Sequence, residues 1–351
     1  MAQPATGIAH ARAGLLGNPS DQYDGKTIAF SIRDFSARVS IEGSDRFVLR
    51  PGPSDLIDFG SFLEAREVIR ARGCDDGIRL LRAAIRRFAD HWEGMQGLAE
   101  DDPLLRFEMR YETSVPRQVG LAGSSAIVIA ALRALMAWFG TEIEPATLAE
   151  LALAAELEDL GISAGPMDRV IQCYEGVMLM DLREPRTAAS YTRLAPEVLP
   201  RLFVAWDPLG GRASGRVHEG VRRRWREGDE EVHRAMAVLD ELVDSGSACL
   251  QRGDHAVFRE LMDRNFDIRA QLFPISKPDR EMVEIGRSHG AATRLCGSGG
   301  AVVGAPADAR EFDEIAAAYR SAGYRVIRPE VHGESGERGA RHEEGAGRWR
   351  K

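Results

Sequence analysis

The sequence predicts an α+β protein of two domains. Segments with the alternating polarity of strands occur in both halves of the chain, and segments with apolar residues at three- and four-residue spacing, typical of helices, lie between them. A chain of 351 residues that is 44% hydrophobic is long enough for about two domains with their own cores. Because a Pro-containing tract near 195–205 separates two patterns, we expect domains at 1–195 and 196–333.

The first domain is expected to begin with a hairpin and continue with helices. Its strand-like segments flank the polar turn PSDQYDG. We predict strands at 8–18, 26–41 and 104–115, helices at 61–73, 77–92, 125–139 and 145–161, and a short apolar strand that ends the segment 165–182.

The second domain is expected to begin with a strand and long helices. We predict helices at 215–227, 229–252, 254–272, 278–289 and 307–322, with strands at 291–306 and 324–331. Residues 334–351 are charged, glycine-rich and almost without aliphatic side chains, so we expect a disordered tail.

Composition excludes several classes of function. The formal net charge of −8 argues against a general nucleic-acid surface. Cys74, Cys173, Cys249 and Cys296 lie far apart, without a metal-ligand spacing, which favours reduced thiols in a cytoplasmic protein. The start of the chain lacks the apolar core of a signal peptide, so we expect no membrane partner.

Two glycine-rich tracts carry the strongest local signal, GLAGSSA at 120–126 and CGSGGAVVG at 296–304. Taken alone, the first is either a tight turn with a serine N-cap or an anion site, because the free amides and dipole of a helix N-terminus favour phosphate. DGKT at 24–27 does not fit the P-loop motif, and the second glycine tract does not fit the dinucleotide fingerprint. The DGKT tract has Ser20 where a P-loop needs glycine, and Ala301–Val303 lead from the second tract into a strand rather than a helix.

The order of four tracts resembles the GHMP kinase superfamily over about residues 8–330. They are HARAGLLGNPSDQYDGKT, PRQVGLAGSSA, AAELEDLGISAGPMDR and RLCGSGGAVV. The resemblance implies the two-domain GHMP kinase fold, with an N-terminal domain similar to ribosomal protein S5 domain 2 and a C-terminal ferredoxin-like α+β domain. It also implies ATP and Mg²⁺ as cofactors. The residues that it assigns to the ATP phosphates are Pro116, Gly120, Leu121, Ala122, Gly123, Ser124, Ser125, Ala126, Gly297, Ser298, Gly299 and Gly300.

The same resemblance assigns the residues of phosphoryl transfer. Asp168 in GPMDR matches the aspartate beside the attacking hydroxyl, and Arg12 matches the basic position near the transferred phosphate. Asp21 matches a sugar-binding aspartate. Asn18 stands where galactokinases carry glutamate, which removes a negative charge and suits an acidic sugar.

A magnesium site is implied at Glu156 together with Ser125, since Mg²⁺ takes hard oxygens from few protein groups and from phosphates. Glu158 is the alternative to Glu156. The two face roughly 200° apart on a helix, so only one of them can point toward the nucleotide.

Several tracts in both domains resemble the plant-type glucuronokinase branch most, among them SGRVHEGVRRRWREGDE and LMDRNFDIRAQLF. The implied activity is ATP-dependent phosphorylation of the anomeric hydroxyl of D-glucuronate, by a monomer or homodimer. A neutral-sugar 1-kinase and a catalytically silent sugar sensor are the alternatives. A sugar acid calls for an arginine fork toward its carboxylate, for which Arg117 and Arg216 are candidates.

Overall fold

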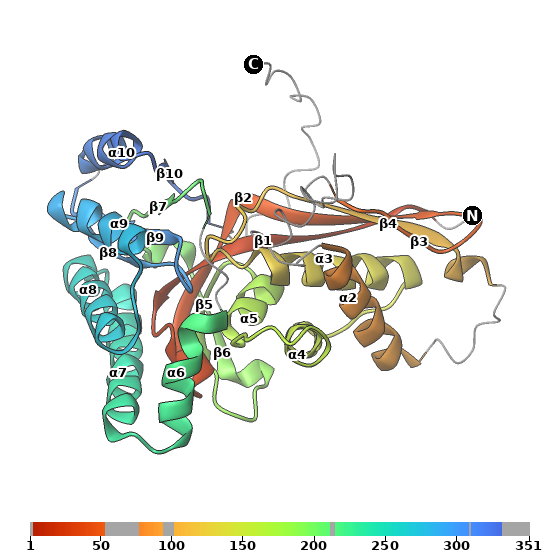
Figure 1. Cartoon of the computed structure of the whole chain (residues 1–351), viewed down its shortest axis with the longest axis horizontal. Coiled ribbons are helices and arrows are strands. Elements are labelled where there is room, and N and C mark those ends of the chain that lie inside the picture. Colours follow the sequence, from red (N-terminus) through yellow and green to blue (C-terminus); the bar gives the residue numbers. More distant parts are fainter. Residues whose placement is uncertain (1–2, 53–76, 94–101, 211–214, 309, 332–351) are drawn as a thin grey trace, which may run out of the picture.

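The computed structural model describes residues 3–52, 77–93, 102–210, 215–308 and 310–331. The helix predicted at 61–73 and the tail predicted at 334–351 lie outside them. Figure 1 shows two lobes joined by a pair of long strands, one lobe built on each of two sheets.

The first lobe contains a six-stranded sheet. Its strands are β1 (Ala5–Leu16), β2 (Lys26–Gly43), β3 (Val48–Leu49), β4 (Phe107–Thr113), β5 (Val177–Asp181) and β6 (Tyr191–Leu194). They follow the order β3-β4-β2-β5-β6, with β1 paired to β2, and every pair is antiparallel except β3 with β4. The predicted hairpin is therefore confirmed, and β6 is a strand that the sequence pattern missed.

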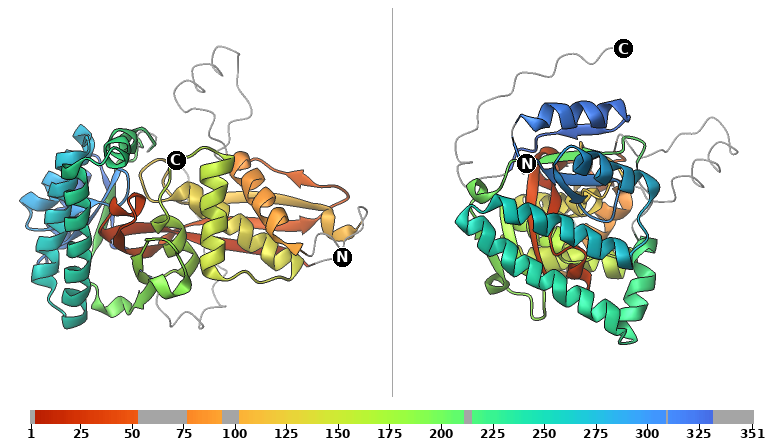
Figure 2. Two further views of the ribbon diagram at one scale, coloured as in Figure 1. Left: turned by 90° about the horizontal axis from the view of Figure 1, so that it is seen from below. Right: turned by 90° about the vertical axis from the view of Figure 1, so that its left-hand side faces the viewer.

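Helices cover one face of this sheet (Figure 2). They are α2 (Gly77–His91), α3 (Gly123–Phe139), α4 (Pro145–Ala154) and α5 (Met167–Tyr174). Helix α3 packs on β1 and β2, and eleven of its residues are buried, which explains its almost uniformly apolar sequence. The helix predicted at 145–161 changes after Ala154 into one π-helical turn (Ala155–Asp159).

The second lobe contains an antiparallel four-stranded sheet in the order β10-β7-β9-β8. Its elements are β7 (Phe203–Trp206), α6 (Gly215–Arg226), α7 (Glu230–Arg252), α8 (His255–Leu272), α9 (Lys277–Ser288), β8 (Ala292–Leu295), β9 (Ala301–Ala305), α10 (Glu311–Ser321) and β10 (Arg325–Ile327). The single strand predicted at 291–306 is wrong. It is a hairpin, because Gly299 and Gly300 have φ values of 140° and 86° that turn the chain between two apolar strands.

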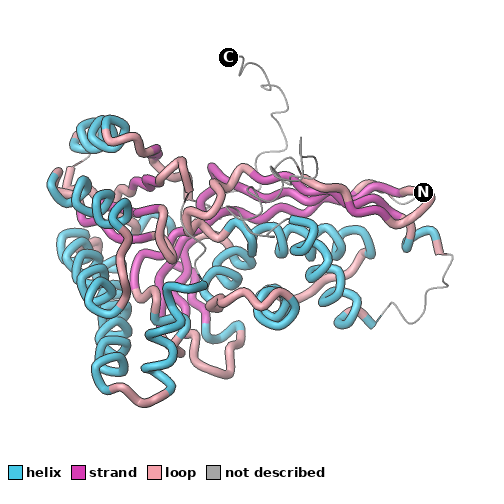
Figure 3. Tube along the Cα trace, in the orientation of Figure 1, coloured by secondary structure: helices cyan, strands magenta, loops and turns pink. Residues whose placement is uncertain are grey.

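The two lobes share a hydrophobic core. The carboxyl-terminal part of β1 and the start of β2 extend into the second lobe, as the strand colouring of Figure 3 shows. There, buried side chains of β1 and β2 such as Leu16 and Phe30 join the same apolar cluster as Phe258, Met262 and Val303. This shared packing fixes how the two lobes face each other at the cleft described next.

Candidate active site

A cleft of about 470 Å³ lies against the amino-terminal end of α3. It is lined by Arg12 of β1, by the segment after β1, by the start of α2, by parts of 111–127 and 156–169, and by Ser298 from the second lobe. Segments from widely separated parts of the chain therefore meet here.

The first glycine tract forms one wall of the cleft. Gly120 and Ala122 both have positive φ, 71° and 62°, and α3 begins directly afterwards at Gly123. The first amides of a helix lack partners within the helix and lie at the positive end of its dipole, which suits an anion. Pro116 and all of Gly120–Ser125 line the cleft. Ala126 does not line it, because its side chain is fully buried in the core.

The second glycine tract packs directly on the first. A Cβ atom on Gly120 would lie 2.5 Å from the carbonyl oxygen of Gly299, and one on Gly297 would lie 2.4 Å from that of Gly120. Only glycine permits this approach of two backbones. Ser298 lines the cleft, whereas Gly297 and Gly300 are buried behind it. The two tracts are thus in contact, and the phosphate roles of the second remain a prediction.

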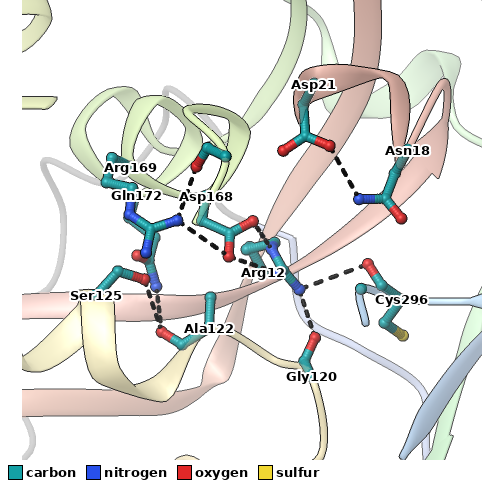
Figure 4. A network of polar contacts seen from close by, with 12 residues as sticks. Arg12, Asn18, Asp21, Gly120, Ala122, Ser125, Asp168, Arg169, Gln172 and Cys296 are labelled. Carbon is teal, nitrogen blue, oxygen red and sulfur yellow. Dashed lines mark hydrogen bonds and ion pairs between the residues drawn. The ribbon is translucent and has the colours of Figure 1, made fainter. Parts of the chain in front are cut away.

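Arg12 and Asp168, which both line the cleft, form a bidentate ion pair (Figure 4). The Arg12 Nε donates to Asp168 Oδ1 over 2.6 Å, and its Nη2 donates to Oδ2 over 2.7 Å. The remaining nitrogen, Nη1, donates to the carbonyl oxygen of Gly120 over 2.5 Å. A charge-assisted fork of this kind fixes both side chains, so the carboxylate is positioned relative to the first glycine tract.

Asp21 and Asn18 lie beside this pair, on the segment that connects β1 to β2. Asn18 Nδ2 donates to Asp21 Oδ1 over 3.3 Å, and both residues line the cleft. Burial, assisted by the charge of Asp168, raises the pKa of Asp21 to about 7. A Cβ atom on Gly165 would lie only 2.0 Å from Asp21 Oδ2, so glycine is required opposite this carboxyl group.

Asn18 also joins the segment to the second lobe. Its side-chain oxygen accepts from Arg269 Nη1 over 2.8 Å, and its carbonyl oxygen accepts from Arg294 Nη2 over 2.8 Å. Both arginines are almost completely buried, and burial lowers their pKa values, to about 10 for Arg269 and about 9 for Arg294. The Arg269 guanidinium therefore contacts the neutral amide of Asn18, whereas a glutamate at this position would place a negative charge there.

Glu156 faces the cleft and Glu158 does not. Glu156 lies in the π-helical turn, is 1% exposed and lines the cleft, and it accepts two hydrogen bonds from the Arg169 guanidinium, one of them from Nε over 2.6 Å. Burial raises its pKa, and the charge of Arg169 opposes that rise. Glu158 lies on the surface and pairs with Arg87 over 2.9 Å. Ser125, the other proposed ligand, donates from Oγ to the Ala122 carbonyl over 3.1 Å.

Other predicted residues have clear places. Arg117 lines the cleft, while the side chain of Arg216 lies outside the described side chains. Cys173, Cys249 and Cys296 are buried free thiols, and Cys74 lies outside the described residues. Within the described part of the chain, no cluster of histidine, cysteine and carboxylate side chains could hold a metal by itself, and no helix could cross a membrane.

The sequence reasoning missed the buried partners of the site, among them Arg169, Gln172, Asn265, Arg269 and Arg294. Helical spacing could have indicated two pairs of these residues. Arg169 and Gln172 are three residues apart and share the face of α5 that contacts the site. Asn265 and Arg269 are likewise four residues apart on α8.

Comparison with known families matches both halves of the chain. Residues 79–176 match the GHMP kinases N terminal domain, and residues 247–325 match the GHMP kinases C terminal domain. Glucuronokinase 1 of Arabidopsis thaliana is 39% identical over 308 residues, which is 84% of this chain and 82% of that protein. Probable glucuronokinase 2 of the same plant is 39% identical over 310 residues and covers the same shares.

Solved structures with low sequence identity have the same fold. A mevalonate kinase is 16% identical with a TM-score of 0.70, covering 95% of this chain and all of that one. The galactokinase of Lactococcus lactis in complex with galactose is 13% identical with a TM-score of 0.69, covering 94% of each chain. Since both family models and relatives spanning most of the chain agree with this fold, the protein belongs to the GHMP kinase family.

Proposed function

We propose that this chain transfers the γ-phosphoryl group of ATP to the anomeric hydroxyl of D-glucuronate, giving glucuronate 1-phosphate and ADP. The Arabidopsis relatives named glucuronokinase support the substrate, because their similarity covers both lobes. The observation that carries the proposal is the Arg12–Asp168 pair, which stands between the first glycine tract and the segment that contains Asp21.

Each part of the cleft has one task in this reaction. The amides at the start of α3 bind the phosphates of ATP, and the Asp21 segment binds the sugar. The anomeric oxygen forms a bond to the γ-phosphorus while the bond from that phosphorus to the β,γ-bridging oxygen breaks. Asp168 orients the hydroxyl and receives its proton, and Arg12 stabilises the negative charge on the phosphoryl group.

The residues present fit a magnesium ion. The cleft offers the carboxylate of Glu156 and the hydroxyl of Ser125, and Mg²⁺ needs only one or two protein oxygens when phosphates and water complete its shell. These two residues would bind the ion, which supplies positive charge against the phosphates. Because Arg169 already binds Glu156, the metal would share this carboxylate with a guanidinium.

The alternatives have less support. The two Arabidopsis relatives at 39% identity are named as kinases of a sugar acid, whereas the galactokinase is only 13% identical and supports the fold alone. A silent sensor has no need for a phosphoryl-transfer set, and the cleft contains Arg12, Asp168 and Glu156 together. We further propose that the domains span residues 1–195 and 196–333, that the protein is a monomer or homodimer, and that it is located in the cytoplasm.

The test is a substrate panel with ATP and magnesium. Glucuronate, galacturonate, glucose, galactose and arabinose are compared by initial rate, and the product is identified by phosphorus NMR. We expect phosphate on the anomeric oxygen of glucuronate, with turnover of glucose at least ~100-fold lower. A preference for a neutral sugar, or phosphate at another position, would refute this substrate and leave the family assignment standing.

A further inference from the structure

A sugar acid differs from a neutral sugar by one carboxylate, and the enzyme must have a cation for it. The following inference rests on the proposed function. With the anomeric hydroxyl at Asp168, the carboxylate lies across the ring oxygen from the reacting carbon. It therefore meets a different wall of the cleft from the one that carries the first glycine tract. Gln22 and Asn18 line the cleft on the sugar side.

The guanidinium groups next to Asp168 already bind carboxylates. Arg12 binds Asp168 through two nitrogens, and Arg169 binds Glu156 through two. Both guanidinium groups are therefore held by residues of the phosphoryl-transfer set, and we assign neither to the sugar carboxylate. Of the other arginines that line the cleft, Arg79 of α2 donates to the Leu160 carbonyl, and Arg117 lies three residues before Gly120 of the first glycine tract, which we assign to ATP.

The buried arginines of the second lobe have neutral partners but lie behind the cleft. Arg269 donates to Asn18 Oδ1 and to the carbonyl oxygens of Gly297 and Ser298, and Arg294 donates to Asn265 and Asn18. Both side chains are only 1% exposed, so neither can contact a substrate in the cleft. Their charges contribute positive potential near the Asn18–Gln22 segment, which Asp21 and, at Arg269, Asp279 partly offset.

Arg222 of α6 is not itself part of the cleft lining, but it contacts the lining residue Gln22 directly. It is half-buried, and its Nη2 donates to Gln22 Oε1 over 2.5 Å, while Gln22 itself lines the cleft. Among the ion pairs of the described residues, none involves Arg222. Its neighbour Arg224 differs in this respect, since it pairs with Asp229 over 2.7 Å.

We propose that Arg222, together with Gln22, binds the carboxylate of the sugar acid and sets the preference of this enzyme over neutral sugars. A carboxylate beside Gln22 would give Arg222 a charged acceptor in place of a neutral amide, and such bonds are about twice as strong. Because Arg222 engages Gln22 Oε1, the Nε2 group of the amide is left to donate to the same anion. Arg222 lies six residues after Arg216 in the same tract.

The test compares Arg222→Gln with Arg223→Gln, a matched control because Arg223 is the exposed neighbour on the same helix. We expect Arg222→Gln to raise the KM for glucuronate roughly 10- to 100-fold, the range for losing a charged hydrogen bond. The KM for ATP and the rate with glucose should stay within about twofold, so selectivity falls by the same factor. Arg223→Gln should behave as the wild type in all three measurements.

Each outcome decides one question. If the wild type prefers glucuronate and Arg222→Gln keeps both its KM and its selectivity, the inference fails and the proposed function stands. If the wild type does not phosphorylate glucuronate, the proposed function fails first. Should Arg222→Gln unfold early, Arg222→Lys takes its place. Lysine keeps the charge but lacks the planar fork, so the preference for glucuronate over glucose should fall, and a lysine variant with the wild-type KM and selectivity overturns the proposal.

Discussion

Arg12 and Asp168 are 156 residues apart in the sequence, yet each nitrogen of the Arg12 Nε–Nη2 edge donates to its own oxygen of the Asp168 carboxylate. Arg12 is 4% exposed and lies on β1, while Asp168 lies in the first turn of α5. The pair therefore depends on the packing of α5 against the sheet. It presents one carboxylate and one guanidinium to the same point of the cleft, as phosphoryl transfer requires.

Replacing Asp168 with asparagine should abolish most turnover without unfolding the protein. The amide retains the size of the side chain but can no longer accept the proton or bind Arg12 as a charged fork. We expect kcat to fall by at least ~100-fold while the affinity for ATP changes little. Asp181→Asn is the control, because that carboxylate forms an exposed ion pair with Arg183 outside the cleft. Turnover of Asp168→Asn near the wild-type rate would remove Asp168 from the mechanism.

Asp21 should make the stability of the unliganded protein depend on pH. Its pKa is about 7 in the folded state against 3.8 for an ordinary aspartate, so between these values the folded state binds more protons than the unfolded one. Stability therefore falls as pH rises from about 4 to 7, and is level above both values. The shift corresponds to about 4 kcal/mol at most. Urea unfolding at pH 5 and pH 8 should show the wild type losing stability relative to Asp21→Asn, and an unchanged difference would contradict this.

Gly165→Ala should impair sugar binding and leave nucleotide binding intact. Its Cβ atom would lie 2.0 Å from Asp21 Oδ2, so either Asp21 or the backbone at Gly165 must move. We expect the KM for the sugar to rise at least about tenfold, with the KM for ATP unchanged. Gly43→Ala is the control, since the nearest atom to its Cβ would be 3.8 Å away on Trp138. An unaltered sugar KM in Gly165→Ala would show that Asp21 is not held in place by this contact.

Local patterns in the sequence predicted much of the fold. The hairpin of β1 and β2, the glycine tract before α3 and the long helices α7 and α8 all follow from periodicity and turn residues within short segments. The pattern failed where it was ambiguous. Apolar residues continue on both sides of Cys296–Gly300, so the β8–β9 hairpin resembled one strand, and the short strand β6 has exposed residues at Thr192 and Arg193.

The electrostatics of the site could not be predicted in the same way. Arginine is common in this sequence, and the sequence pattern does not distinguish a surface arginine from a buried one. Arg294 lies in a strand whose four residues are all buried, and its partners Asn18 and Asn265 come from other parts of the chain. Which guanidinium is neutralised depends on contacts between distant segments, so the proposal of Arg222 required the structure.

Glu156→Gln should both destabilise the protein and raise its magnesium requirement, and two comparisons separate these effects. The change leaves Arg169 buried without its carboxylate, which costs about 3 kcal/mol of unfolding free energy. Ser125→Ala removes a proposed ligand but no ion pair, so it should raise the magnesium concentration for half-maximal rate with a smaller loss of stability. Glu158→Gln breaks only the surface pair with Arg87 and should change neither quantity measurably. If Glu156→Gln lowers the thermal midpoint but leaves the magnesium requirement unchanged, Glu156 serves only as the partner of Arg169. A raised requirement in Glu158→Gln alone would instead place the metal on the other face of this turn.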